Sequence, residues 1–160
     1  MKKNLCIVFC LIFPVFFCLM GRNAQAEPPF KTYYVSLISD ESHMRTGPGY
    51  RYPIEWLYTR QHMPFLVIDS FDHWRQVKDY KGTIGWFHKK LLSTRKTAIV
   101  IRDKAILRKR ATLDSEPLAE TEKGVVAFVE ECSNKWCYLS FSGTEMEGWL
   151  YEGDLWGALN

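Results

Sequence analysis

The sequence has few of the residues from which catalytic and metal sites are built. It contains four histidines (His43, His62, His73 and His88), and none has a His-x-His or His-x-x-x-His spacing. Metal binding and general base catalysis need such groups to converge with carboxylates, so we expect these histidines to be scattered over the surface. Asp69, Asp72 and Asp79 fall at expected turns and hairpin edges, where carboxylates are solvated. No serine has a Gly-x-Ser-x-Gly context. We predict a protein without enzymatic activity, metal or cofactor.

Cysteine is almost absent beyond the first residues. Of five cysteines, only Cys132 and Cys137 follow residue 26. Their C-x4-C spacing is neither a redox C-x-x-C motif nor a set of four zinc ligands. An even pair in an exported chain predicts one disulfide, here at the mouth of a hairpin. Closing so short a loop is worth about 2 kcal/mol in the loop-entropy expression.

The chain also lacks an excess of charge after residue 26. Without Lys2, Lys3 and Arg22, 18 Lys and Arg balance 18 Asp and Glu, which argues against a nucleic-acid partner. The charge is unevenly shared, with +4 over residues 27–97 and −4 over residues 98–160. This asymmetry is consistent with packing between the halves, with head-to-tail association, or with two solvated surfaces of different composition.

The one long apolar run lies at the N-terminus. Basic Lys2 and Lys3 precede apolar residues 5–20, and Ala24-Gln25-Ala26 follows. These are the three parts of a secretory signal peptide, and the run is shorter than the roughly 20 residues of a membrane span. A lipoprotein signal at Cys18 is disfavoured because small residues do not precede it. We predict cleavage after Ala26, export to the periplasm and no membrane span in the mature chain.

The rest of the chain alternates like short strands and shows no amphipathic helix. Residues 73–87 read as a hairpin that starts at Trp74, turns at Lys81-Gly82 and ends on Gly85-Trp86. We expect a single 3₁₀ turn over residues 88–92. Short, closely spaced strands are typical of small β-barrels.

A second copy of this pattern follows at an offset of 62 or 63 residues. Trp74 matches Trp136, Gly85-Trp86 matches Gly148-Trp149, and the change of offset places one inserted residue near Glu145. The predicted organisation is a signal peptide (1–26), an N-terminal arm (27–32), a first domain (33–93), a linker (94–97) and a second domain (98–160).

The two Gly-Trp pairs are expected to be structural. Gly85 and Gly148 would let the backbone pass close to a neighbouring strand. Trp86 and Trp149 would then fill the two cores, where one large aromatic side chain buries about 150–250 Å².

The order of these motifs resembles that of bacterial SH3-type domains. The residues that carry the resemblance are Met44-Arg45-Thr46-Gly47-Pro48-Gly49, Trp74-Arg75-Gln76-Val77, Gly85-Trp86-Phe87 and Leu91-Leu92. The second copy departs from the pattern, with Arg110-Ala111-Thr112 where the Gly-Pro turn would be. The resemblance implies an all-β fold of two tandem SH3-like barrels, each with five or six strands. It also implies a binding role at the cell envelope, commonly on peptidoglycan.

Aromatic and arginine side chains cluster around the first long loop and the start of the hairpin. We expect them to form a ligand-binding surface made of Arg45, Tyr50, Arg51, Tyr52, Trp56 and Trp74. In SH3-like barrels this region forms a groove in which aromatic faces meet sugar rings or peptides and arginine pairs with carboxylates. The alternative for Trp56 and Trp74 is that they cover the open end of the barrel.

Three functions are compatible with this interpretation. The first is a periplasmic module that binds a cell-envelope ligand, either a peptidoglycan peptide or a glycan. The second is an adaptor that binds a periplasmic protein through a peptide groove or a sheet edge. A cell-wall hydrolase is the third and the least supported, because no catalytic constellation is visible.

Overall fold

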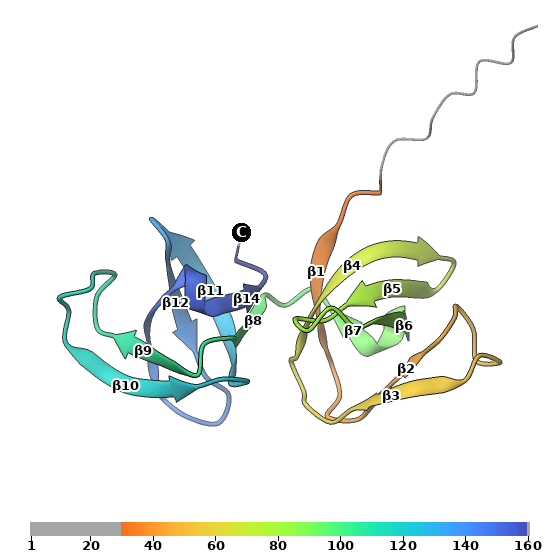
Figure 1. The fold of residues 1–160 in the computed structure, drawn as a ribbon, viewed down its shortest axis with the longest axis horizontal. Coiled ribbons are helices and arrows are strands. Elements are labelled where there is room, and N and C mark those ends of the chain that lie inside the picture. The colour runs from red at the N-terminus through yellow and green to blue at the C-terminus, as the bar shows by residue number, and fades with distance from the viewer. Residues whose placement is uncertain (1–29, 160) are drawn as a thin grey trace, which may run out of the picture.

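The fold consists almost entirely of antiparallel β-strands arranged as two similar domains (Figure 1). The computed structural model describes residues 30–159. The predicted signal peptide and its cleavage site after Ala26 lie outside these residues. Within the described part of the chain, no helix has the length and apolar character needed to cross a membrane.

The first domain is a seven-stranded sheet with the order β3-β2-β6-β5-β4-β1-β7. Its elements are β1 (Tyr33–Leu37), β2 (Ser42–Arg45), β3 (Ile54–Tyr58), β4 (Pro64–Phe71), β5 (Trp74–Lys78), β6 (Ile84–His88), the 3₁₀ turn η1 (Lys89–Leu91) and β7 (Leu92–Ser93). The predicted 3₁₀ turn is therefore confirmed.

The second domain repeats this topology, with the order β10-β9-β13-β12-β11-β8-β14. Its elements are β8 (Thr97–Val100), β9 (Lys104–Arg108), β10 (Pro117–Glu122), β11 (Val126–Ser133), β12 (Trp136–Ser140), β13 (Glu147–Tyr151), η2 (Glu152–Asp154) and β14 (Leu155–Gly157). Each strand occupies the place of the strand seven positions earlier, so the internal repeat seen in the sequence is a repeat of the whole fold.

The predicted hairpins form in both domains with matching register. Trp74 lies opposite His88 across β5 and β6, and Trp136 lies opposite Tyr151 across β12 and β13. The second hairpin has one more residue in its turn, since Lys78 pairs with Ile84 but Ser140 pairs with Glu147. The insertion predicted near Glu145 is therefore located in this turn.

Each domain has its own hydrophobic core. In the first, Phe65 and Phe87 are fully buried, with ring centroids 5.2 Å apart. The second core is aliphatic, and its buried members include Leu107, Leu139 and Leu150. The two cores stand on separate sets of strands, one on each side of residues 94–96.

The prediction that Trp86 and Trp149 fill the cores is wrong. Both side chains are only half-buried, whereas Trp74 and Trp136 are buried, with 7% and 8% of their surface exposed. Successive side chains of a strand point to opposite faces. Because the residues that precede and follow Trp86 in β6 face the core, Trp86 itself lies on the outer face.

The expected role of the two glycines is confirmed. A Cβ atom at Gly85 would lie 2.4 Å from Sδ of Met44, whose side chain occupies the core space that a larger residue would need. A Cβ atom at Gly148 would lie 2.9 Å from the carbonyl oxygen of Arg108. The absent side chains therefore allow β6 to approach β2 and β13 to approach β9.

The two domains contact each other through aromatic and cationic side chains. The rings of Tyr34 and Trp156 meet edge to face, with centroids 5.3 Å apart. His62 packs against Phe128 with centroids 4.8 Å apart, and the guanidinium of Arg95, from the linker, lies 3.5 Å from the Phe128 ring centroid. These contacts place β8 and β14 beside the first domain, as Figure 1 shows.

The predicted disulfide is present. Cys132 and Cys137 are bonded across β11 and β12, directly before the turn that joins these strands. Cys137 is fully buried in the second core, while Cys132 packs against its edge. The bridge therefore fixes the end of the hairpin from which Trp136 projects.

Gly85→Ala is expected to lower the free energy of unfolding of the first domain by about 1–3 kcal/mol, because the added methyl overlaps the Met44 side chain. Gly49→Ala is the matched control, since its Cβ would have only an ordinary contact, 3.4 Å from Tyr52. Denaturant unfolding measures both variants. Equal stability of Gly85→Ala and wild type would contradict the close approach of β2 and β6.

Reduction of the Cys132–Cys137 disulfide is expected to lower the stability of the second domain by about 2 kcal/mol, because the unfolded chain gains loop entropy. Amide hydrogen exchange measures the stability of both domains in one experiment. Protection of the Leu139 amide in the second core should fall, whereas protection of the Val77 amide in the first core should not. An equal loss at both amides would show that the domains unfold together.

Candidate binding pocket

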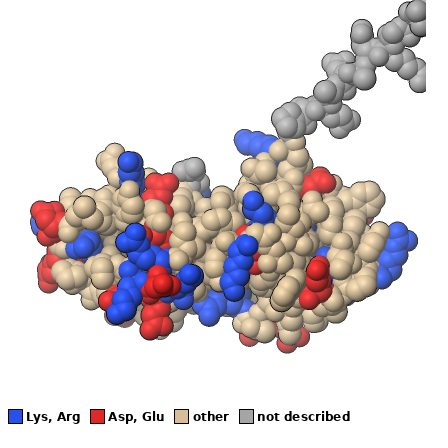
Figure 2. Space-filling view, in the orientation of Figure 1, with Lys and Arg blue, Asp and Glu red and all other residues tan. Residues whose placement is uncertain are grey.

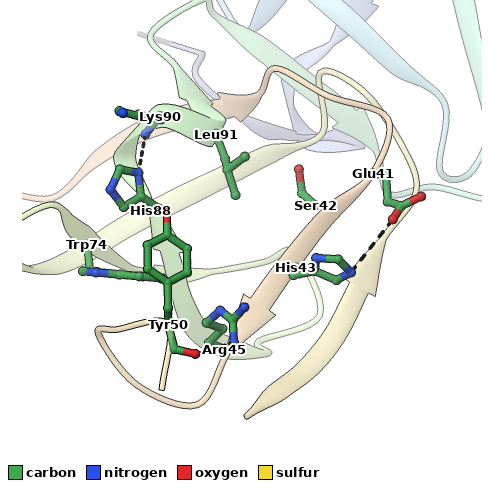
Figure 3. Close-up of a pocket in the computed structure, with 9 residues that line it drawn as sticks. All are labelled: Glu41, Ser42, His43, Arg45, Tyr50, Trp74, His88, Lys90 and Leu91. Atoms are coloured by element: carbon green, nitrogen blue, oxygen red, sulfur yellow. Dashed lines mark hydrogen bonds and ion pairs between the residues drawn. The ribbon is translucent and has the colours of Figure 1, made fainter. Parts of the chain in front are cut away.

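A pocket of about 340 Å³ lies at one end of the first domain (Figure 3). Its walls come from β2 and the segment before it, from the β2–β3 loop, from the first residue of β5 and from the end of β6 with η1. The lining residues are Glu41, Ser42, His43, Arg45, Tyr50, Trp74, His88, Lys90 and Leu91.

Arg45 shapes the loop that carries Tyr50. Its Nη1 donates hydrogen bonds to the carbonyl oxygens of Tyr50, at 3.1 Å, and Tyr52, at 2.7 Å. The Tyr52 ring packs against Gly47, where a Cβ atom would lie only 2.5 Å from it. The loop is thus folded back on its own strand, and Tyr50 is held over the pocket.

Three aromatic rings form one wall. The Tyr50 ring stacks on His88, with centroids 5.8 Å apart and planes at 21°, and meets Trp74 edge to face at 5.0 Å. Trp74 also contacts its cross-strand partner His88 at 5.4 Å. Although two rings support it, Tyr50 remains 71% exposed. The wall therefore presents a fixed aromatic face to solvent.

The opposite side of the pocket is polar. Glu41 and His43 lie 3.9 Å apart there, across the pocket from Tyr50 in Figure 3. Lys90 contributes a second cation besides Arg45. The pocket thus combines an aromatic surface with groups of both charges, which suits a polar ligand that has an apolar face.

The surroundings of His88 favour its neutral form. Burial lowers its pKa from the ordinary value, and the nearby positive charge of Lys90 lowers it further. Its Nδ1 accepts a hydrogen bond from the backbone N–H of Lys90 at 3.2 Å and so caps η1. Protonation at Nδ1 would remove this bond. The charge of the imidazole therefore affects η1, whose residues Lys90 and Leu91 line the pocket.

The structure brings together three of the six predicted ligand-binding residues: Arg45, Tyr50 and Trp74 line the pocket. Tyr52 instead supports the loop from beneath, and Arg51 lies over the Tyr52 ring at 5.3 Å. Trp56 lines a different hollow on β3. The six residues therefore do not form one continuous surface, because Tyr52 packs under the loop and Trp56 lies on β3 beside another hollow.

The prediction of scattered surface histidines is wrong for His88. This residue is only 8% exposed, and it lines the same pocket as His43. The hairpin register could have located His88, because strands that turn symmetrically about Lys81 place residue 88 opposite Trp74. Nothing in the sequence pattern indicated the contribution of Glu41 and Lys90.

Asp79 is not solvated as expected. It is 4% exposed and accepts hydrogen bonds from the backbone N–H groups of Lys81 and Thr83, at 2.9 and 2.8 Å, and from the Tyr58 hydroxyl at 3.0 Å. Burial and the Asp79 carboxylate raise the pKa of Tyr58. Asp69 and Asp72 are exposed as predicted. Asp79 therefore has a structural role, in the hairpin turn.

Among residues 30–159, no group of three or more histidine, cysteine, aspartate or glutamate side chains is placed to hold a metal ion. Arg45 and Trp74 instead occupy positions that hold the pocket wall together through hydrogen bonds and ring packing. The pocket lining offers aromatic faces, hydrogen-bonding groups and charged side chains of both signs.

The lowered pKa of His88 predicts that acid destabilises the first domain. The unfolded chain takes up this proton near pH 6.5 while the folded chain resists it, so stability should fall as the pH drops below about 6.5. NMR titration should place the His88 midpoint below that value, and His88→Asn, which keeps an acceptor for Lys90, should flatten the decline. A midpoint at or above 6.5 would contradict the buried, neutral imidazole.

Comparison with solved structures found matches of low overall similarity. NlpC2 from Trichomonas vaginalis is 9% identical, with a TM-score of 0.34, covering 79% of this chain and 48% of that one. An NlpC/P60 family protein from Bacillus cereus ATCC 10987 is 13% identical, with a TM-score of 0.35 and coverage of 78% and 56%. NlpC1 from Trichomonas vaginalis is 8% identical, with a TM-score of 0.34 and coverage of 82% and 48%. The chain thus spans about half the length of these structures.

No curated protein matched the chain. The sequence profile of the bacterial SH3 domain matches it twice, at residues 39–94 and 102–157. Each match covers most of one of the two sheets, including the strand pair that carries the Gly-Trp motif. The chain belongs to the bacterial SH3 domain family, of which it contains two tandem copies.

Proposed function

We propose that this protein is an exported, non-catalytic binding module whose first domain binds a cell-wall component, a peptidoglycan peptide or glycan, in the pocket beside Tyr50. The observation that carries the proposal is the exposed Tyr50 ring, fixed by Arg45 and supported by Trp74 and His88. A rigid aromatic face of this kind loses little conformational entropy when a ligand binds to it.

The charges of the pocket support a ligand that is itself both cationic and anionic. Arg45 and Lys90 can pair with carboxylates, and Glu41 can pair with an amine. Cell-wall peptides carry both groups, and glycan rings have apolar faces that pack on aromatic side chains. Membership of the bacterial SH3 domain family supports the same class of ligand, because domains of this family generally bind cell-wall components.

The proposed location is the periplasm. The disulfide supports it, because such bonds persist in oxidising compartments outside the cytoplasm. The basic start, apolar run and Ala-x-Ala site of residues 1–26 support it independently.

A second candidate function is that of an adaptor for a periplasmic protein, and strand β3 favours it. This strand lies at the edge of the first sheet, and Ile54, Trp56 and Leu57 are 49%, 52% and 51% exposed. An edge strand offers unpaired backbone groups to an extended peptide. The apolar side chains around it would give such a peptide additional contacts.

The test is retention of the full chain on purified sacculi. Tyr50→Ala is expected to reduce retention about tenfold or more, since loss of a central aromatic contact commonly costs at least roughly 1.4 kcal/mol. Trp56→Ala is the matched control, because it removes an exposed aromatic ring outside the pocket and should leave retention unchanged.

Failure of the wild-type chain to bind sacculi would overturn the proposal. If the sacculi retained Tyr50→Ala as well as wild type, the pocket would not be the site. Loss of a single dominant protein partner in Trp56→Ala, measured by cross-linking in the envelope, would favour the adaptor function instead.

A further inference from the structure

The second domain has a pocket at the position equivalent to that of the first. It measures about 360 Å³ and is lined by Arg102, Lys104, Ile106, Arg108, Leu113, Trp136, Tyr151 and Asp154. Seven of these residues lie 62 or 63 positions after a residue that lines the first pocket: Lys104, Ile106, Arg108, Leu113, Trp136, Tyr151 and Asp154.

The framework of the two pockets is the same. Trp136 meets its cross-strand partner Tyr151 edge to face, with centroids 5.7 Å apart, as Trp74 meets His88. Arg108 donates through Nη1 to the carbonyl oxygen of Ser115 at 2.8 Å, a residue seven positions further along. Arg45 and the Tyr52 carbonyl have the same separation. The two pockets therefore share the contact between the tryptophan and its cross-strand partner and the bond from the arginine to a loop carbonyl oxygen.

The chemistry of the two pockets differs. Lys104 stands in the second pocket where Glu41 stands in the first, and Leu113 replaces the Tyr50 ring. Arg102 adds a further cation. Three of the seven Lys and Arg residues of the second domain thus line one pocket, although residues 98–160 carry a net charge of −4. Figure 2 shows basic and acidic side chains together over the lower part of this domain.

These cations have partners, but not enough to neutralise the pocket. Arg102 pairs through Nε with Oδ1 of Asp154 at 2.6 Å, which compensates a carboxylate that is itself buried. Lys104 pairs with Glu120 at 3.2 Å, and its side chain is 74% exposed. Exposed pairs of this kind contribute little free energy, so a ligand can compete with Glu120 for the Lys104 ammonium.

An apolar surface borders these charges. The Leu113 side chain is 76% exposed and that of Tyr151 39% exposed, and both line the pocket. A ligand that satisfies both features carries an anionic group next to a ring with an apolar face. A sugar with a carboxylate substituent has this combination.

We propose that the second domain binds a carboxylate-bearing sugar in this pocket, with Lys104 and Arg108 facing the carboxylate and Tyr151 and Leu113 contacting the sugar ring. The proposal adds a second site to the chain and does not depend on what the first pocket binds.

The probes are N-acetylmuramic acid and N-acetylglucosamine, which share a sugar ring and differ in the carboxylate-bearing substituent. In an NMR titration of the full chain, the Trp136 and Tyr151 signals should shift and saturate with N-acetylmuramic acid. Affinity for the neutral sugar should be lower by about fivefold or more, and added salt should reduce the difference because it screens the charges.

Lys104→Gln should weaken binding of the acidic sugar about two- to fivefold, the range of an exposed ion pair. Lys123→Gln is the matched control, because Lys123 pairs with Asp103 outside the pocket. Tyr50→Ala should leave the titration unchanged, which separates this proposal from that for the first pocket.

Equal shifts with both sugars, or no shift at Trp136, would overturn the proposal. The same holds if Lys104→Gln has no larger effect than Lys123→Gln. Displacement of the sugar by an equal concentration of inorganic phosphate would also overturn it, because the site would then recognise any anion.

Discussion

The close approach of two strands at a glycine is the constraint on which both domains depend. In the first domain, Gly85 leaves room for the Met44 side chain in the core. Arg45 follows Met44 and, by strand alternation, points away from the core. Its guanidinium then binds the carbonyl oxygens of the loop that carries Tyr50. Core packing and pocket formation are therefore consequences of the same strand crossing, and Gly148 and Arg108 repeat the arrangement in the second domain.

This arrangement separates the parts of the domain that maintain the fold from those that are free to vary. The buried tryptophan, its cross-strand partner and the arginine recur in both domains at matching positions. The residues around them differ: Glu41 in the first pocket corresponds in position to Lys104 in the second, and Tyr50 to Leu113. One framework thus presents two pockets of different charge.

Repetition in the sequence predicted most of the fold, whereas the site was predicted only in part. Strand patterns, the 62- or 63-residue offset and the paired cysteines lead directly to two similar sheets and a disulfide. The Gly-Trp motif favours Trp86 as a core residue. Strand alternation instead places Trp86 on the outer face, and Trp74 is the buried tryptophan of the hairpin. The position of His88 follows from the hairpin register, whereas nothing in the sequence pattern indicated that Glu41 lines the same pocket.

The chain presents two pockets at matching positions, each organised around a buried tryptophan. Titration of the isotope-labelled full chain with soluble peptidoglycan fragments, observed at the six indole N–H signals, tests it most directly. We predict that the Trp74 and Trp136 signals shift, while Trp56 and the interface residue Trp156 do not. Shifts confined to Trp56 or Trp156, or no shift at Trp74 and Trp136, would contradict the account.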